Sequence, residues 1–350
     1  MIFDHKLRVK KLRAELKRRG IGSVLVTNES NVRYLTGFKG GDSLVVITPD
    51  SQFFLTDSRY AEEAKDSVSG FTIVEVTTST YDCISNILKK NRIRKMGFDS
   101  LNLPYEVATR LAGHIRPAKL VSTKNIIESL RAVKDPKEIE AIKRSIDLTK
   151  KVLNKVSKAV RPGISERYIS DLIECEFIKK GARIAFETIV AHGKNCSKPH
   201  AHATEEKIAG NDVVMLDMGC KLDLYNSDMT RMLFVGKVRD KIKEIYGIVS
   251  AAQKAAIEKI RPGVRVSDID IAGRGYIERK GYGKFFGHSI GHGIGIDVHE
   301  EPSISKRNNN VLKSGMVFTV EPAIYLPKVG GVRIEDMVLV TDKGCEILTR

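Results

Sequence analysis

Hydrophobic and polar positions in the first third of the chain alternate between helical and strand spacing. An opening helix carries leucines on one expected face, at Leu7, Leu12 and Leu16. Gly20 ends this helix, and the apolar run 21–27 predicts a buried strand. The same patterns predict strands at 43–48, 52–56 and 71–76 and helices at 59–67, 81–90 and 104–115. We expect an α/β unit with a mixed sheet and no catalytic cluster.

The pattern changes near residue 130, where we place the boundary between a first domain, 1–130, and a second domain, 131–350. Asp135-Pro136-Lys137-Glu138 is a strong helix start, because Asp can cap, Pro suits the first helical position and Glu138 can reach back to the cap. Apolar positions at helical spacing then predict a long amphipathic helix, at Ile139, Ile142, Ile146, Val152, Leu153 and Val156.

An internal repeat follows this helix. Val160-Arg-Pro-Gly-Ile164 returns one hundred residues later as Ile260-Arg-Pro-Gly-Val264, and matching Lys-Gly and Phe positions follow at the same offset. Each copy predicts a helix, an Arg-Pro-Gly turn, a second helix and a Gly-led strand. The second domain should therefore consist of two related α+β halves.

The stretches 212–218 and 225–235 predict two strands of a hairpin. If Leu222-Asp223 is its centre, Asp217 and Asp228 are equidistant from the turn and lie opposite each other, with Cβ atoms roughly 4.5 to 5.5 Å apart. Two carboxylates this close repel each other unless a cation lies between them.

A second hairpin repeats this arrangement, because Glu321 and Glu335 are symmetric about Lys328. Asp217 and Glu321 close apolar runs, where an unpaired charge would be costly to bury. A lone acid would be interpreted as a surface group. The joint pattern instead predicts that both hairpins present acids to one metal site.

The Gly-rich stretch 286–302 contains three of the eight histidines of the chain, His288, His292 and His299. Glycines on both sides of His292 let the backbone approach a ligand closely, and His200, in a polar loop, is a further candidate. Four carboxylates and one imidazole form a ligand set that suits two hard divalent cations. The expected ligands are Asp217, Asp228, His292, Glu321 and Glu335.

Length and composition are those of an ordinary globular protein, with 350 residues, 42% hydrophobic and 29% charged. The net charge of +16 raises the question of nucleic-acid binding. The basic residues are mixed with apolar positions at helical spacing, so we interpret them as solvated faces and expect no nucleic-acid partner. The chain shows no signal peptide, no membrane-length apolar run and no Cys-x-x-Cys pair. We expect a cytoplasmic protein with reduced cysteines and no membrane partner.

The chain resembles the aminopeptidase P and prolidase branch of the pita-bread metallopeptidases over essentially its whole length. The similar segments are Phe186–Ala191, Pro199-His200, Leu216–Gly219, Ser227–Arg231, Gly287–Gly293, Val298–Pro302, Thr319–Pro322 and Gly331–Asp336. The resemblance implies an α/β creatinase-like N-terminal domain and an α+β pita-bread C-terminal domain with a pseudo-twofold repeat. We expect two divalent ions, Mn²⁺ first and Co²⁺ or Zn²⁺ as alternatives, and a homodimer.

The resemblance also implies a role for each metal ligand. Asp217 would be the terminal ligand of one ion, and Asp228 and Glu335 would bridge the pair. His292 and Glu321 would complete the ligands of the second ion. Paired ions of this kind activate water for attack on the scissile carbonyl and stabilise the oxyanion that develops.

Other residues would act on water and substrate. Glu321 is the general base that the resemblance implies. His299 and His200 would hydrogen-bond the substrate carbonyl and the tetrahedral intermediate. His288 would shape the proline pocket, and Arg333 would orient the nearby acids.

The chain departs from the family pattern around the expected site. His192 stands where a small residue is more usual, and Ala201 replaces a common glycine. His202 and Cys196 add potential ligands near the mouth of the site. We interpret these departures as neutral loop variation rather than as changes in substrate preference or metal access.

Two peptidase activities fit this resemblance, and two other functions are disfavoured. The main prediction is an Xaa-Pro aminopeptidase, which releases the N-terminal residue before proline from a peptide. The alternative is a prolidase restricted to Xaa-Pro dipeptides, which needs the same metal site and differs in the surrounding loops. A catalytically silent pita-bread binding module is disfavoured because all five ligands are present, and a methionine aminopeptidase because those enzymes generally lack such an N-terminal domain.

Overall fold

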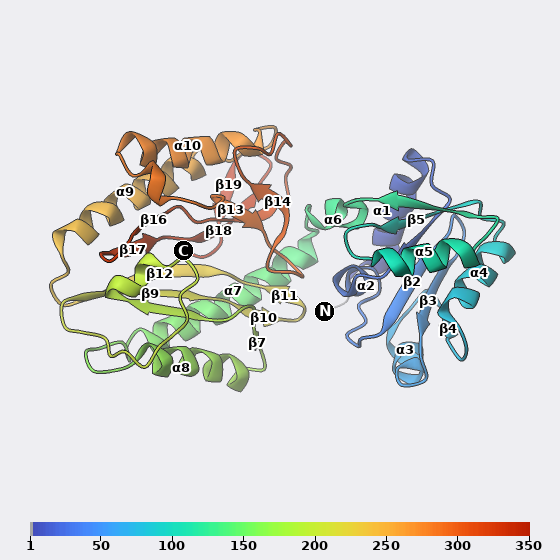
Figure 1. The fold of residues 1–350 in the computed structure, drawn as a ribbon, viewed down its shortest axis with the longest axis horizontal. Helices are drawn as coiled ribbons and strands as arrows, with labels where there is room; N and C mark the ends of the chain where they lie inside the picture. The colour runs from blue at the N-terminus through green and yellow to red at the C-terminus, as the bar shows by residue number, and fades with distance from the viewer. Residues whose placement is uncertain (1–2) are drawn as a thin grey trace. The chain divides into compact units, whose positions relative to one another are not determined.

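The protein is described by a computed structural model that covers residues 3–350. It divides into two compact units, the first ending at Arg131 and the second spanning Ala132–Arg350 (Figure 1). None of the helices within residues 3–350 combines the length and the hydrophobicity needed to cross a lipid bilayer.

The first unit is a six-stranded sheet with helices on it. The strand order is β4-β3-β2-β1-β5-β6, and β2 runs antiparallel to both of its neighbours while the other pairs are parallel. The predicted mixed sheet is therefore confirmed. The strands are β1 (Ser23–Val26), β2 (Ser43–Ile47), β3 (Gln52–Thr56), β4 (Thr72–Glu75), β5 (Lys95–Asp99) and β6 (Lys119–Thr123).

The helices of this unit are α1 (His5–Arg18), α2 (Glu29–Thr36), α3 (Ala61–Ser67), α4 (Thr80–Lys90), α5 (Tyr105–His114) and α6 (Ile126–Arg131). The prediction missed α2, α6, β5 and β6, which are short or lack a clear apolar period. It also misplaced Leu7, which is 42% exposed. Val9, Leu12 and Leu16 form the buried stripe of α1, because they follow the three- and four-residue spacing that Leu7 breaks.

The second unit begins with α7 (Pro136–Val156), and its predicted capping box is confirmed. The Asp135 carboxylate accepts a hydrogen bond from the Glu138 amide at 2.9 Å, and the Glu138 carboxylate accepts one from the Asp135 amide at 2.9 Å. Glu138 also accepts a hydrogen bond from the buried Tyr225 hydroxyl at 2.8 Å. The start of α7 is thereby tied to β11 (Tyr225–Asn226).

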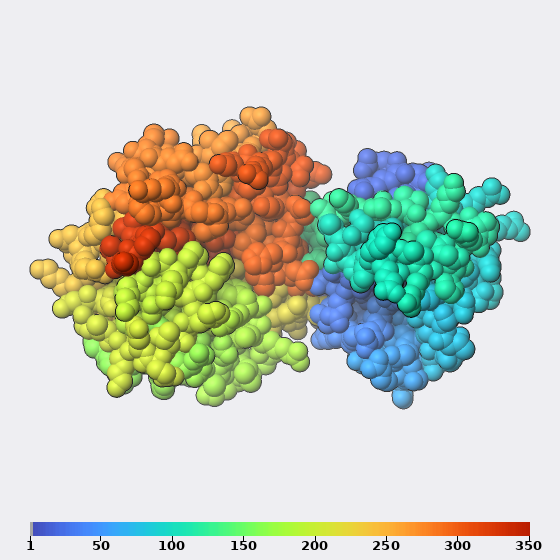
Figure 2. Space-filling view, in the orientation of Figure 1, coloured from blue at the N-terminus to red at the C-terminus, as the bar shows by residue number. Residues whose placement is uncertain are grey.

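The internal repeat is visible in the backbone. The helices α8 (Glu166–Lys179) and α10 (Val266–Arg279) have the same length and begin one hundred residues apart. The turn glycines before them, Gly163 and Gly263, both have positive φ, at 88° and 83°. Figure 2 shows the green to yellow first half and the orange to red second half of this unit. The prediction of two related halves is confirmed.

The copies differ after the second helix, where a strand was predicted in each. The first half has the short strand β7 (Arg183–Ile184), whereas the second has a 3-10 helix, η2 (Gly283–Phe285). The strand prediction for the second copy is therefore wrong. A turn that closes locally at Gly283 satisfies the backbone there, because the Phe286 amide donates to the Gly283 carbonyl at 3.3 Å.

Two main sheets and two small ones complete this unit, with α9 (Asp240–Ile257) and α10 packed against the shared core. The main sheets have the orders β12-β9-β8 and β14-β13-β15-β18-β19. Their strands are β8 (Ile189–His192), β9 (Asp212–Met218), β12 (Met229–Val235), β13 (Gly291–Gly293), β14 (Glu300–Ile304), β15 (Val317–Val320), β18 (Asp336–Val340) and β19 (Cys345–Ile347). The small sheets add β10 (Cys220–Leu222), which pairs with β7 and β11, and the hairpin of β16 (Ala323–Leu326) and β17 (Gly330–Arg333).

The capping box should make a measurable contribution to the second unit. We expect Asp135→Ala to lower its free energy of unfolding by about 1 kcal/mol, since the α7 N-terminus loses a hydrogen-bond acceptor. Urea unfolding followed by circular dichroism measures the change. Asp147→Ala, at an exposed position of the same helix, is the control, and equal effects of the two substitutions would contradict the prediction.

Candidate metal centre

The first acidic hairpin has a different register from the predicted one. Thr230, and not Asp228, pairs with Asp217 across β9 and β12. The turn is centred between Asp223 and Leu224, which both have positive φ, at 49° and 77°, so the partner shifts by two residues. Because side chains alternate faces with a period of two, this shift leaves Asp228 on the side of Asp217, as its diagonal neighbour.

The second acidic hairpin has the predicted register. Val320 pairs with Asp336 and Ala323 pairs with Arg333, on either side of a turn at Lys328 with φ of 65°. Glu321 lies between β15 and β16, and Glu335 lies between β17 and β18. The symmetry of these two glutamates about the turn is therefore confirmed.

The second unit contains a cavity of about 590 Å³. Every residue predicted for the site lines it, although the residues come from segments up to about 130 positions apart in the sequence: His200, Asp217, Asp228, His288, His292, His299, Glu321, Arg333 and Glu335. Apolar side chains, including Phe186, Ile189 and Val298, complete part of the wall. The structure thus brings both acidic hairpins and the four histidines to one space.

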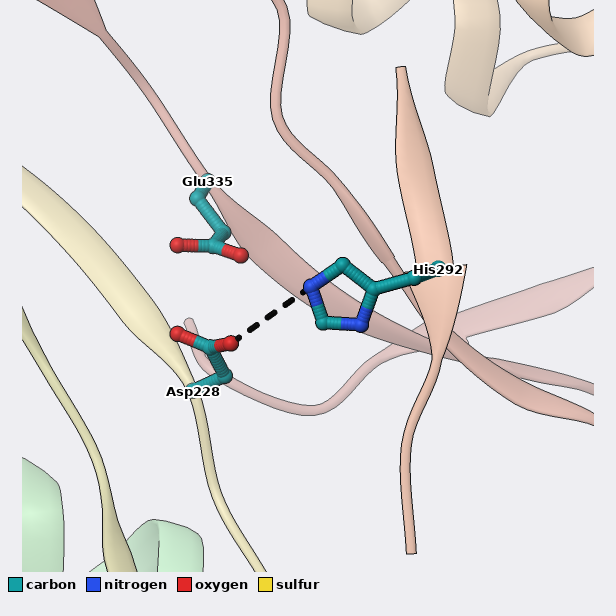
Figure 3. A group of neighbouring side chains, drawn as sticks. All are labelled: Asp228, His292 and Glu335. Atoms are coloured by element: carbon teal, nitrogen blue, oxygen red, sulfur yellow. Dashed lines mark ion pairs between the residues drawn. The ribbon is translucent and has the colours of Figure 1, made fainter. Parts of the chain in front are cut away.

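Three donors lie especially close together (Figure 3). One ligand atom each from Asp228, His292 and Glu335 falls within 4.8 Å of the others. The His292 Nε2 atom is 3.7 Å from an Asp228 carboxylate oxygen and 3.4 Å from a Glu321 carboxylate oxygen. Oxygen donors with a single imidazole are the set that hard divalent cations accept.

The electrostatics of these acids, like their donor atoms, favour a bound cation. Burial raises the pKa of Asp228 well above its ordinary value, and the charges of Glu335, Asp217 and Glu321 raise it further. Burial likewise raises the pKa of Glu335, with Glu321 and Asp217 adding to the effect. One oxygen each of Asp217 and Asp228 is buried with no hydrogen-bond partner. Divalent cations would satisfy these oxygens and offset the repulsion, so the residues fit a metal centre.

Arg333 connects the acids of the two hairpins. Its guanidinium forms a buried ion pair with Asp217, and its Nε donates to the Thr230 hydroxyl at 3.0 Å. The Thr230 hydroxyl donates to Glu335 at 2.7 Å, and a second guanidinium nitrogen donates to the Tyr325 hydroxyl at 2.7 Å. The sequence argument missed Thr230 and Tyr325. The available signal for Thr230 was its place two residues after Asp228, whereas nothing local marks Tyr325.

Three of the histidines that line the cavity have lowered pKa values. Burial lowers the pKa of His288, His292 and His299, and for His299 the neighbouring His292 and His200 lower it further. His288 Nε2 lies 3.2 Å from the hydroxyl of Tyr325. Lowered pKa values favour neutral imidazoles, which can bind a metal or donate a hydrogen bond without carrying charge.

Three of the four residues noted as departures, Cys196, His192 and His202, lie in different surroundings. Cys196 is fully buried in the core and its thiol donates to the Ala191 carbonyl at 3.2 Å, while burial raises its pKa to about 12. Cys196 therefore does not offer a ligand to the cavity. His192 also lies outside the cavity wall, where its ring forms a hydrogen bond with Glu166. His202 does line the cavity, with its Nδ1 atom 2.8 Å from Glu187.

Comparison with known proteins covers both units. The Creatinase/Prolidase N-terminal domain matches residues 8–133, and metallopeptidase family M24 matches residues 140–342. The Xaa-Pro dipeptidase of Pyrococcus furiosus is 35% identical over 348 residues, 99% of this chain and 98% of the relative. A solved Xaa-Pro dipeptidase from Bacillus anthracis has a TM-score of 0.95 at 37% identity, over 99% of this chain and 98% of that one. A solved X-Pro aminopeptidase from Thermotoga maritima MSB8 has a TM-score of 0.88 at 34% identity, over 96% of this chain and 97% of that one.

The raised carboxylate pKa values predict an unusual effect of Asp228→Asn. Because the folded metal-free protein holds protons that the unfolded chain releases, its stability falls as pH rises from the ordinary carboxyl range towards the raised pKa. Removing one acid should therefore raise the melting temperature of the chelated protein at neutral pH. The same variant should lose most of the further rise that Mn²⁺ gives the wild type.

Differential scanning fluorimetry with and without Mn²⁺ measures both effects. Asp171→Asn, at an exposed position on α8, is the matched control and should leave both melting temperatures unchanged. An Asp228→Asn protein that keeps the full Mn²⁺-induced rise would show that Asp228 is not a ligand.

Proposed function

This chain belongs to metallopeptidase family M24, and we propose that it is a prolidase, which hydrolyses the Xaa-Pro bond of dipeptides. The observation that carries the proposal is the match of relatives named Xaa-Pro dipeptidase over 98% to 99% of the chain. These relatives support the dipeptidase alternative better than the aminopeptidase that was the main prediction. The cavity with all five metal donors gives this activity a chemical basis.

Asp217, Asp228, His292, Glu321 and Glu335 would hold two divalent ions. When bound, such ions supply Lewis-acid activation of water and of the scissile carbonyl. The four carboxylates favour Mn²⁺, with Co²⁺ or Zn²⁺ as alternatives in vitro. The buried oxygens of Asp217 and Asp228 that lack hydrogen-bond partners support this assignment.

Glu321 is the general base of the proposed reaction. Burial raises its pKa, which makes its carboxylate a better proton acceptor than an exposed glutamate. Thr319 donates a hydrogen bond to one of its oxygens at 3.2 Å and so helps to orient it. The Nδ1 atom of His288 lies 3.9 Å from the other oxygen.

Substrate would be bound by the remaining residues of the cavity. His200 and His299 would donate hydrogen bonds to the carbonyl oxygen as negative charge develops on it. His288 would shape the proline pocket. Arg333 would orient the acids, because it contacts Asp217 directly and reaches Glu335 through Thr230.

An Xaa-Pro aminopeptidase remains the second candidate function. The observation that favours it is the likeness to the X-Pro aminopeptidase from Thermotoga maritima, which has a TM-score of 0.88. Both activities use the same chemistry, and the space beyond the proline residue distinguishes them. A silent binding module is disfavoured, because all five donors line one cavity.

Location and assembly complete the proposal. We place the protein in the cytoplasm, since its five cysteines are free and free thiols suit a reducing compartment. We also propose a homodimer, with no nucleic-acid or membrane partner.

Substrate length tests the proposed activity directly. We expect turnover of Xaa-Pro dipeptides and little or none of Xaa-Pro-Xaa-Xaa tetrapeptides, because a dipeptidase must exclude the longer chain. Chromatographic analysis of the released amino acid measures both reactions. Comparable kcat/KM values for the two substrates would favour the aminopeptidase, and turnover of neither would reject the proposed function.

Metal dependence is the second test. Chelation should abolish hydrolysis, and stepwise return of Mn²⁺ should restore it in proportion to the metal bound, because the ions activate the attacking water. Steady-state rates with parallel metal analysis measure this relation. Turnover that persists in fully chelated protein would contradict the metal-dependent mechanism.

A further inference from the structure

Glu166, at the start of α8, has a fully buried carboxylate that accepts five hydrogen bonds. One oxygen accepts from the His192 amide and the His192 ring, both at 2.8 Å, and from the Asn195 side chain at 3.1 Å. The other oxygen accepts from the Thr204 amide at 3.0 Å and from the Thr204 hydroxyl at 2.6 Å. We call these four residues, Glu166, His192, Asn195 and Thr204, the Glu166 clasp.

The clasp holds both ends of a loop that forms part of the cavity wall. His192 and Asn195 lie before the cavity-lining segment 199–202, and Thr204 follows it after Ala203. The middle of the loop is fixed separately, because the Pro199 carbonyl accepts a hydrogen bond from Arg333 at 3.0 Å. One buried carboxylate therefore binds the chain on both sides of the segment that carries His200.

We propose that Glu166 is a positioning residue, which acts through this loop to hold His200 and the Pro199 carbonyl in place at the metal centre. Glu166 does not line the cavity, so it would not touch substrate. Its effect on turnover rests on the proposed peptidase function, whereas its effect on the loop does not.

The charge of Glu166 makes the clasp strong. Burial opposes the charge, but hydrogen bonds from His192, Thr204 and Asn195 outweigh it and lower the pKa of Glu166 to about 2. The hydrogen bond to Glu166 raises the pKa of His192, burial opposes this, and the charges of Asp212 and Glu206 add to the rise. Hydrogen bonds to a charged group are roughly twice as strong as neutral ones. A neutral side chain of the same shape would therefore hold the loop much less firmly.

The second half of the unit contains a parallel arrangement. Asp270 on α10 is fully buried and accepts hydrogen bonds from the Ile290 amide at 3.2 Å and from the Arg274 guanidinium at 2.7 and 2.8 Å. Arg274 in turn donates to the carbonyls of Phe286 and His288. In both halves, a buried acid on the second helix fixes a segment that carries a cavity histidine, which argues that these acids serve the site.

The His192 ring supplies one of the five hydrogen bonds that Glu166 accepts. The His192 amide, the Asn195 side chain and Thr204 would still bind Glu166 without that ring. His192→Ala should therefore loosen the clasp partly, and Glu166→Gln should loosen it more.

Hydrogen exchange and kinetics on the Mn²⁺-loaded protein test the proposal. We expect Glu166→Gln to speed amide exchange in 192–206, with little change in the hairpins that carry the metal donors. We expect kcat on an Xaa-Pro dipeptide to fall roughly 10- to 100-fold with Mn²⁺ content unchanged, since a displacement of about 1 Å can cost that much. His192→Ala should cause a smaller rise in amide exchange in 192–206 and a smaller fall in kcat. This variant provides the test if Glu166→Gln does not fold.

Glu176→Gln is the matched control. Glu176 is also a buried acid of α8, but it pairs with Lys155 at 2.8 Å and Lys179 at 3.4 Å, away from the loop. It should keep kcat within about 2-fold and leave exchange in 192–206 unchanged. Unchanged loop exchange in both clasp variants, or equal loss of activity in Glu176→Gln, would overturn the proposal. An inactive wild-type protein would reject the prolidase function and leave the exchange test intact.

Discussion

The repulsion among four carboxylates that line one cavity, three of them buried, is the constraint on which the structure of the second unit depends. Only one cationic side chain, Arg333, lies within the described cavity wall, and it pairs with Asp217. Burial and mutual repulsion therefore raise the pKa of Asp228 and Glu335. A site of this kind lowers the stability of the metal-free protein, and cation binding reverses that cost. The rest of the unit can be understood as the framework that holds these acids together.

That framework is repeated. Each half supplies a hairpin that carries two of the acids, and each half fixes a histidine-bearing segment through a buried acid, Glu166 or Asp270. Backbone amides provide part of these contacts, and the side chains of His192, Asn195, Thr204 and Arg274 provide the rest. Duplication of one supporting arrangement thus produces two walls of a single cavity, while the donors themselves differ between the halves.

Chemistry and substrate length are determined by different parts of the molecule. In the proposed reaction, the same five donors would serve an Xaa-Pro bond in a dipeptide or in a longer peptide. Under the proposed function, substrate length would depend on the cavity walls away from these donors, where His202 and Glu187 form an exposed pair. For this reason the metal donors, which identify the family, say little about substrate length. The similarity of the whole chain to Xaa-Pro dipeptidases says more.

Local and periodic features could be predicted from the sequence, because each is encoded within a short segment. These include the capping box of α7, the repeat, and the register around Lys328, whose positive φ places the turn at the predicted centre. The exact register of the first hairpin could not be predicted. Its turn places both Asp223 and Leu224 at positive φ, and the sequence around them contains no pattern that indicates this pair of turn residues. Other features depend on how segments distant in the sequence pack together, and no short-range pattern predicts them. Examples are the contacts of Arg333 with Thr230 and Tyr325 and the burial of Cys196.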